Sequence, residues 1–219
     1  MNVFTRDSWL ARFFFLVGDI VTLHILWIIT SIPIITIGAS TTALYYCCMK
    51  RIRRDEGYSW RNYLHSFKEN FRQSTILWLL MLAVGFVLVL DFRIGLAAYG
   101  IAGKIMVFTS VLLMLPYLLV SLYIFPVQAK FHNPIALNLK NALLMSIANF
   151  GWTVLLVILQ VFFVILTLTA APFIGLLLVC GAGMIGYLNS TFFVTIFRKY
   201  LPEEFEEDLE ATGMDQVDF

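Results

Sequence analysis

Few side chains in this sequence could do chemistry, and four of them stand out because long apolar stretches surround them. Asp19 and His24 supply a carboxylate and an imidazole, which could bind a solute or carry a proton, whereas Gln160 and Asn189 supply amides. His24 lies five positions after Asp19, about 140° around a helix, so these two residues do not form one ligand pair. We expect Asp19 to serve either as a substrate or proton site or as a hydrogen-bonding group that holds helices together. Polar contact within a bundle is the expected role of His24, and Gln160 and Asn189 are expected to meet across two neighbouring helices.

Motifs of catalytic or metal sites do not occur in the sequence. There is no HExxH, GxSxG or P-loop pattern, and there are only three histidines. The three cysteines, Cys47, Cys48 and Cys180, have neither disulfide nor zinc spacing. We therefore expect no enzymatic activity, no metal, no cofactor and no nucleic-acid partner.

The composition is that of a membrane protein. Hydrophobic residues make up 60% and charged residues 13% of the 219 residues, against about 25% charged residues in a soluble domain. The net charge of +1 conceals an asymmetry, because residues 203–219 hold eight of the 14 acidic residues and no basic one. We predict an all-α, polytopic membrane domain over residues 1–202 and an acidic cytoplasmic tail over residues 203–219.

The first apolar stretch predicts a hairpin that turns at a proline. No aspartate, glutamate, lysine or arginine other than Asp19 lies between Arg12 and Lys50. Pro33 lacks an amide hydrogen and disfavours the helical conformation of the residue before it, so the helix should break there. The return helix is rich in small residues around Gly38, which favour close helix packing, so we expect it to lie at the centre of the bundle.

Four more membrane spans are predicted after this hairpin, which makes six in all. One runs over residues 73–90, and the next over residues 105–125, where Pro116 predicts either bundle curvature or a gate and Pro126 ends the helix. Two more spans must lie between Lys140 and Arg198, with a turn at residues 170–172 that includes Pro172. The predicted hinge and packing positions are therefore Pro33, Gly38, Pro116 and Pro172.

Two polar connections between the spans are predicted to be amphipathic helices on the cytoplasmic side. In residues 55–72 an apolar stripe faces away from most of the charged residues, and it either lies in the lipid headgroup layer or forms a platform for a partner. The second connection, residues 130–149, has an apolar stripe from which Asn138 and Asn141 point away, and it is expected to run into the fifth span. The predicted surface of the first connection consists of Trp60, Leu64, Phe67 and Phe71 with Arg61 and Lys68.

The distribution of basic residues predicts the orientation. If six spans leave both termini in the cytoplasm, only Arg93 and Lys104 of the 15 lysines and arginines lie outside. The outer face then has almost no loops, so capture of a ligand there by this chain alone is not expected.

Several segments resemble the YesL family of bacterial integral membrane proteins. They are LWIITSIPIITIGASTTALYY, SFKENFRQSTILWLL and the Lys140, Asn141, Ala142 helix. The resemblance implies a multi-span protein of the bacterial cytoplasmic membrane that is encoded near carbohydrate ABC-transporter genes and has no established activity.

Two functions follow as hypotheses. The first is an accessory or regulatory subunit that docks through its cytoplasmic helices onto a carbohydrate ABC-type uptake system. The alternative is a small transporter with a pocket between the two proline-containing hairpins, near Asp19 and His24. The expected partners are the lipid bilayer and either a membrane protein or a second copy of the chain.

Overall fold

The protein is helical throughout the part that its structure, a computed structural model, describes: residues 9–54, 60–131, 133–169 and 171–201. The described elements are α1 (Trp9–Ser31), η1 (Ile34–Thr36), α2 (Ile37–Arg54), α3 (Trp60–Ala97), α4 (Ile101–Lys130), α5 (Ile135–Ala148), α6 (Phe150–Thr169) and α7 (Ala171–Arg198). The predicted acidic tail, residues 203–219, lies outside the described residues.

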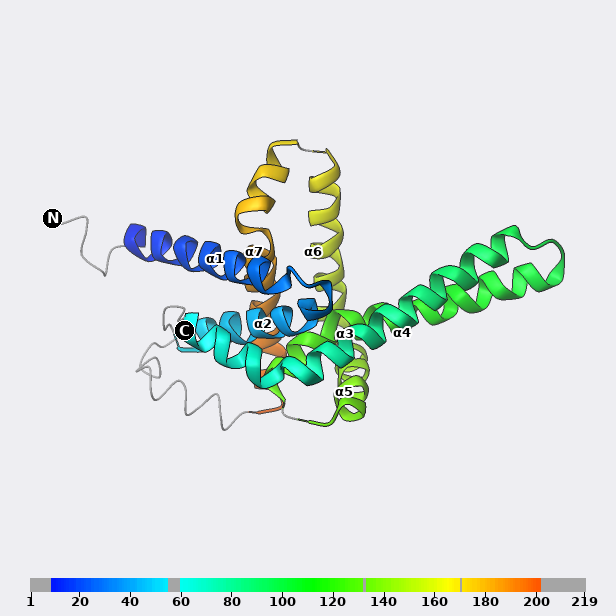
Figure 1. The fold of residues 1–219 in the computed structure, drawn as a ribbon, viewed down its shortest axis with the longest axis horizontal. Coiled ribbons are helices and arrows are strands. Elements are labelled where there is room, and N and C mark those ends of the chain that lie inside the picture. The colour runs from blue at the N-terminus through cyan, green and yellow to red at the C-terminus, as the bar shows by residue number, and fades with distance from the viewer. Residues whose placement is uncertain (1–8, 55–59, 132, 170, 202–219) are drawn as a thin grey trace.

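The helices form a central body from which two helical hairpins project. Figure 1 shows α3 and α4 leaving the body side by side as a long arm, while α6 and α7 leave it in another direction. The second helix, α2, lies in the middle and contacts α1, α3, α4 and α7. This is the central position that its small residues predicted.

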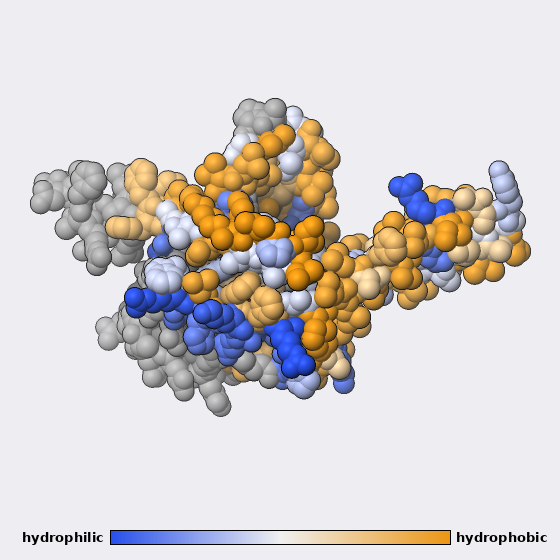
Figure 2. All heavy atoms as spheres, in the orientation of Figure 1, coloured by the Kyte–Doolittle hydropathy of each residue, from blue (hydrophilic) through white to orange (hydrophobic). Residues whose placement is uncertain are grey.

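Five of the described helices are long and apolar enough to cross a membrane, namely α1, α3, α4, α6 and α7. These helices support a multi-pass membrane protein in contact with lipid, but the predicted count of six spans is not confirmed, because α2 does not meet the same criteria. The polar end of α2, from Lys50, lowers its average hydropathy. In Figure 2 hydrophobic residues cover most of both projecting hairpins, while hydrophilic residues lie near the tip of the α3–α4 arm and gather over the end of α2 and the start of α3.

The predicted break at Pro33 is confirmed. Helix α1 ends at Ser31, and Pro33 has an extended backbone with ψ of 113° before the short helix η1. The Thr36 hydroxyl lies 2.6 Å from each of the Thr30 and Pro33 carbonyl oxygens and can donate its hydrogen to either. The Pro33 carbonyl also accepts a hydrogen bond from the Thr36 N–H at 2.9 Å.

Close backbone approach holds α2 against α3. A side chain at Gly38 would overlap the Ser74 carbonyl oxygen and lie 2.6 Å from the Trp78 Cβ atom. One turn further on, the Thr42 and Ser74 hydroxyl oxygens are 2.9 Å apart and share a hydrogen bond. Small residues therefore let the two backbones meet where larger ones would keep them apart.

Glycines of α7 allow a similarly close approach to α1 and α2. A Cβ atom at Gly183 would overlap the Ile20 carbonyl oxygen of α1, and one at Gly186 would lie 2.9 Å from the Leu44 side chain of α2. The two predicted hairpins are thus packed together through α7, which contacts both α1 and α2.

The structure corrects two predicted boundaries. Residues 60–72 and the third span are one uninterrupted helix, α3, rather than a separate amphipathic helix followed by a span. Helix α4 continues through Pro116 and Pro126 to Lys130, so Pro126 does not end it. A proline removes one backbone hydrogen bond, which neighbouring helices compensate, and Pro126 is buried among them.

The other connections are tighter than predicted. Gly100, with φ of +85°, lies in the short turn between α3 and α4, a conformation that favours glycine. Asn149 separates α5 from α6, so the second amphipathic segment does not run unbroken into its span. Pro172 is the second residue of α7, which begins at Ala171, so it lies in the helix rather than in the predicted turn.

The contact at Gly38 makes a prediction about stability. Gly38→Ala should lower the free energy of unfolding by about 1–3 kcal/mol, because the new methyl group has to push α3 away. Gly18→Ala in α1 is the matched control, since a Cβ atom there meets nothing within 4 Å. Thermal unfolding of both variants in detergent would measure the difference, and equal stabilities would contradict the packing described.

Candidate functional site

Asp19 lies on α1 opposite the basic end of α2. Its Oδ2 atom is 3.5 Å from Nε of Arg51, and the two side chains are only 22% and 13% exposed. An opposite charge at this distance stabilises a carboxylate that would otherwise be costly next to hydrocarbon. The structure thus gives Asp19 a partner that the sequence analysis did not name, because the pairing depends on how α1 and α2 align.

His24 is buried and joins α1 to the backbone of α7. The Ala182 N–H donates to Nδ1 of His24 at 3.1 Å, and Nε2 lies 3.1 Å from the Leu178 carbonyl oxygen. Because a carbonyl only accepts, the neutral imidazole must carry its hydrogen on Nε2.

The two backbone groups that His24 contacts are those which a regular α-helix pairs with each other. The N–H of residue 182 normally donates to the carbonyl of residue 178, four positions earlier. His24 therefore hydrogen-bonds the backbone of α7 within a single turn of that helix.

Gln160 and Asn189 do contact each other, as the sequence analysis expected. Nε2 of Gln160 donates to Oδ1 of Asn189 at 3.1 Å, which links α6 to α7. Asn189 also donates from Nδ2 to the hydroxyl of Tyr45 on α2, at 3.1 Å, a partner that was not anticipated. Asn189 is 1% exposed, so this group of three residues, the Tyr45 triad, bonds three helices inside the protein.

The four candidate polar residues therefore make three separate contacts. Asp19 faces the end of α2, His24 faces the middle of α7, and Gln160 with Asn189 faces Tyr45. Each contact joins helices, and each uses hydrogen-bonding atoms that a solute would otherwise engage.

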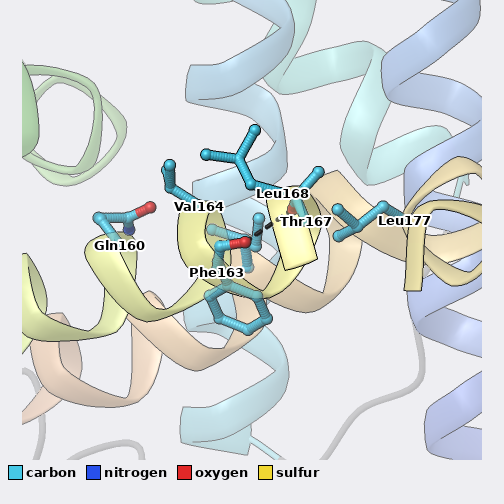
Figure 3. Close-up of a pocket in the computed structure, with 7 residues that line it drawn as sticks. Gln160, Phe163, Val164, Thr167, Leu168 and Leu177 are labelled. Carbon is cyan, nitrogen blue, oxygen red and sulfur yellow. Dashed lines mark hydrogen bonds between the residues drawn. The ribbon is translucent and has the colours of Figure 1, made fainter. Parts of the chain in front are cut away.

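A cleft lies within the second hairpin, between α6 and α7. Figure 3 shows that Phe163, Thr167 and Leu177 line it, with Gln160 at one end. The Thr167 hydroxyl donates to the Phe163 carbonyl oxygen of its own helix at 2.7 Å, so most of the wall is apolar. Such a surface suits an acyl chain or an apolar side chain better than a sugar.

The predicted aromatic surface on the first part of α3 is only partly covered. Trp60 is 57% and Phe71 40% exposed, while Leu64 and Phe67 are half-buried against the body. The Arg61 guanidinium lies 5.5 Å from the centre of the Trp60 ring, a cation–π contact, and Lys68 is exposed. This surface remains available to lipid or to a partner.

The face of α3 that is buried instead carries polar residues. Asn70 accepts a hydrogen bond at 3.1 Å from Gln128 on α4, and Gln128 accepts one at 2.6 Å from Asn138 on α5. Gln73 also donates to the Asn133 carbonyl oxygen. This amide chain contradicts the expectation that Asn138 points away from the packed face, because Asn138 is fully buried.

The remaining predicted positions have simple placements. Pro33 is exposed at the turn, Gly38 is buried against α3, and Pro116 is half-buried within α4. In the part of the chain that the structure describes, no group of three histidine, cysteine or acidic side chains lies close enough together to hold a metal ion.

The Tyr45 triad leads to a second prediction. Asn189→Ala should lower the free energy of unfolding by about 1–3 kcal/mol, because it removes the partner of Gln160 and of Tyr45 in a buried place. Thr195→Ala is the control, since Thr195 is exposed on the same helix and its hydroxyl bonds the Thr191 carbonyl of that helix. Denaturation in mixed detergent would compare the two variants, and similar losses would argue against a role for the triad.

Comparison with known proteins finds a family match over part of the chain. Residues 20–92, from α1 through most of α3, match a family model described as "Protein of unknown function, DUF624". No curated protein and no solved structure matches the chain. The matched residues include His24, Pro33 and Gly38, together with the aromatic surface of α3.

Proposed function

We propose that this protein is a non-enzymatic accessory or regulatory subunit of a bacterial carbohydrate ABC-type uptake system, located in the cytoplasmic membrane with both termini inside. The proposal rests on the contacts that the polar residues of the helices make. Asp19, His24 and Asn189 each hold helices together, which is the role of a scaffold rather than of a translocation pathway.

The length of α3 and the residues exposed along it support docking onto a membrane partner. Its exposed aromatic and basic surface, near Trp60 and Phe71, belongs to the same helix as the apolar stretch from Ile76 to Leu90. A partner with both a membrane part and a cytoplasmic part could therefore contact both regions at once. Exposed aromatic and arginine side chains are the residue types that most often dominate protein interfaces. The link to carbohydrate uptake comes from the YesL resemblance.

Crosslinking in native membranes tests this proposal. A photo-crosslinking amino acid at Trp60 or Phe71 should give an adduct with a membrane component of a carbohydrate ABC transporter, identified by mass spectrometry. The control position is Phe162, which is exposed on α6 of the other projecting hairpin. The double change Trp60→Ala and Phe71→Ala should weaken co-purification by about thirtyfold or more, since a single interface aromatic worth about 2 kcal/mol already accounts for that factor.

Adducts with lipid alone at both positions would contradict the docking proposal, and so would adducts only with a second copy of the chain. Phe162→Ala should leave co-purification unchanged, which separates a loss of docking from a loss of folding.

The transporter hypothesis has one structural feature in its favour, the cleft between α6 and α7. That cleft lies within the second hairpin rather than between the two hairpins, and its walls are mostly apolar. A transporter that works through Asp19 would lose solute flux in reconstituted vesicles when Asp19 is changed to Asn, while the protein stays folded.

We expect a different outcome for Asp19. Asp19→Asn should lower stability by about 1–3 kcal/mol, because Arg51 then loses this carboxylate in a largely buried place. Exchanging the charges in Asp19→Arg with Arg51→Asp should restore part of the loss, as measured by thermal unfolding. Normal stability together with abolished flux would favour the transporter instead.

A further inference from the structure

The turn between α1 and α2 lies beside the middle of α3. Trp78, halfway along α3, donates from its indole nitrogen to the Ile34 carbonyl oxygen at 2.9 Å. Gly38, just after the turn, lies against Ser74 and Trp78. Figure 1 agrees, since this turn is found where the arm leaves the body, far from the tip of the arm.

The position of Trp78 along α3 indicates how deep this turn lies in a membrane. Arg72 and Asp91 bracket the uncharged part of α3, which is about 28 Å long and so matches the roughly 30 Å of bilayer hydrocarbon. Trp78 lies about 9 Å along the helix from Arg72 and about 20 Å from Asp91. The turn therefore stops well short of the level of Asp91.

The ion pair between α1 and α2 gives a second indication of depth. The Asp19–Arg51 pair joins the middle of α1 to the basic end of α2. From this pair to the Pro33 turn each helix is about 20 Å long, whereas a crossing needs about 30 Å. The part of the hairpin between the ion pair and the turn is therefore too short to cross the membrane and return, although α1 as a whole is long enough.

The surface of the turn is nevertheless apolar, as expected for contact with the hydrocarbon of a membrane. Ile32, Ile34 and Ile35 are 75%, 69% and 54% exposed. Between Asp19 and Lys50 there is no aspartate, glutamate, lysine or arginine, and the histidine in that segment, His24, is buried. An apolar tip of this size in water would be costly, at about 25 cal/mol per Å².

Protein groups also bond the carbonyls of the turn, which water would satisfy if the turn were outside the membrane. Thr36 lies within hydrogen-bond distance of the Thr30 and Pro33 carbonyls, and Trp78 donates to the Ile34 carbonyl. Thr30 in turn donates to the Leu26 carbonyl at 2.8 Å. Non-helical backbone at membrane depth persists only when such partners are present.

We propose that the α1–α2 hairpin is re-entrant: it enters the bilayer from the side that carries Lys50 and Arg51, turns at Pro33 among the acyl chains of that leaflet, and returns to the same side. The partner of the exposed isoleucines is lipid. Four helices, α3, α4, α6 and α7, then cross the membrane, and the basic ends of the hairpin stay on one face. This inference does not depend on the proposed accessory function.

Accessibility of single cysteines tests the proposal. Starting from a variant with Cys47, Cys48 and Cys180 changed to alanine, a cysteine replaces Ile34 at the turn, or Tyr99 at the tip of the arm, where the side chain is fully exposed. A membrane-impermeant maleimide is added to right-side-out and to inverted vesicles. We expect Tyr99→Cys to react from one face, and Ile34→Cys to react at less than about one-tenth of that rate from either face, because hydrocarbon excludes the charged reagent.

A lipid readout separates burial in the bilayer from burial in protein. Bimane attached to Ile34→Cys should be quenched by phospholipids brominated near the middle of the acyl chain, and bimane on Tyr99→Cys should be quenched much less. Ile32→Cys provides a second turn position, at 75% exposure, if the first variant does not fold. If the cysteine-free protein does not fold, Cys180→Ala alone serves as the background, because Cys47 and Cys48 are buried.

Three results would overturn the proposal. Fast labelling of Ile34→Cys from the face that labels Tyr99→Cys would mean that the hairpin crosses the membrane. Fast labelling from the opposite face would mean that the turn lies in water on the basic side. Slow labelling without quenching by brominated lipid would mean that protein, not lipid, covers the turn.

Discussion

Glycines let α2 pack closely against its neighbours, and the rest of the structure depends on these contacts. Gly38 lies against the α3 backbone at Ser74, and Gly186 of α7 leaves room for the Leu44 side chain of α2. In lipid there is no hydrophobic drive to bring helices together, so association relies on close packing and on hydrogen bonds between them. Helix α2 contacts α3 and α4 of one projecting hairpin and α7 of the other, so both hairpins are packed against it.

Polar side chains add specificity to this packing. The Tyr45 triad joins α2, α6 and α7, the amide chain through Gln128 joins α3, α4 and α5, and His24 joins α1 to α7. In a low-dielectric interior each such group is costly without a partner, so an alternative helix arrangement that separates the partners is disfavoured. The polar residues therefore help to select one arrangement among several that would bury similar apolar surface.

Local sequence features were predictable because their causes are local. The break at Pro33, the small-residue face at Gly38 and the contact between Gln160 and Asn189 follow from sterics or from two amides in adjacent helices. The pairing of Asp19 with Arg51 and the burial of Asn138 depend on how separate helices align, which a single sequence does not encode in any short pattern. The change from polar to apolar residues after Arg72 suggested a helix boundary, yet α3 continues, because nothing at that point interrupts its backbone hydrogen bonds.

Because α3 is one continuous helix, a change in its tilt moves both of its ends. With 38 residues it is about 57 Å long, and neither proline nor glycine occurs from Trp60 to Val84 to weaken it. A change of about 5° in its tilt therefore displaces one end relative to the other by about 5 Å. A change in bilayer thickness around the α3–α4 arm would in this way reach the opposite end of the helix as a movement of Trp60.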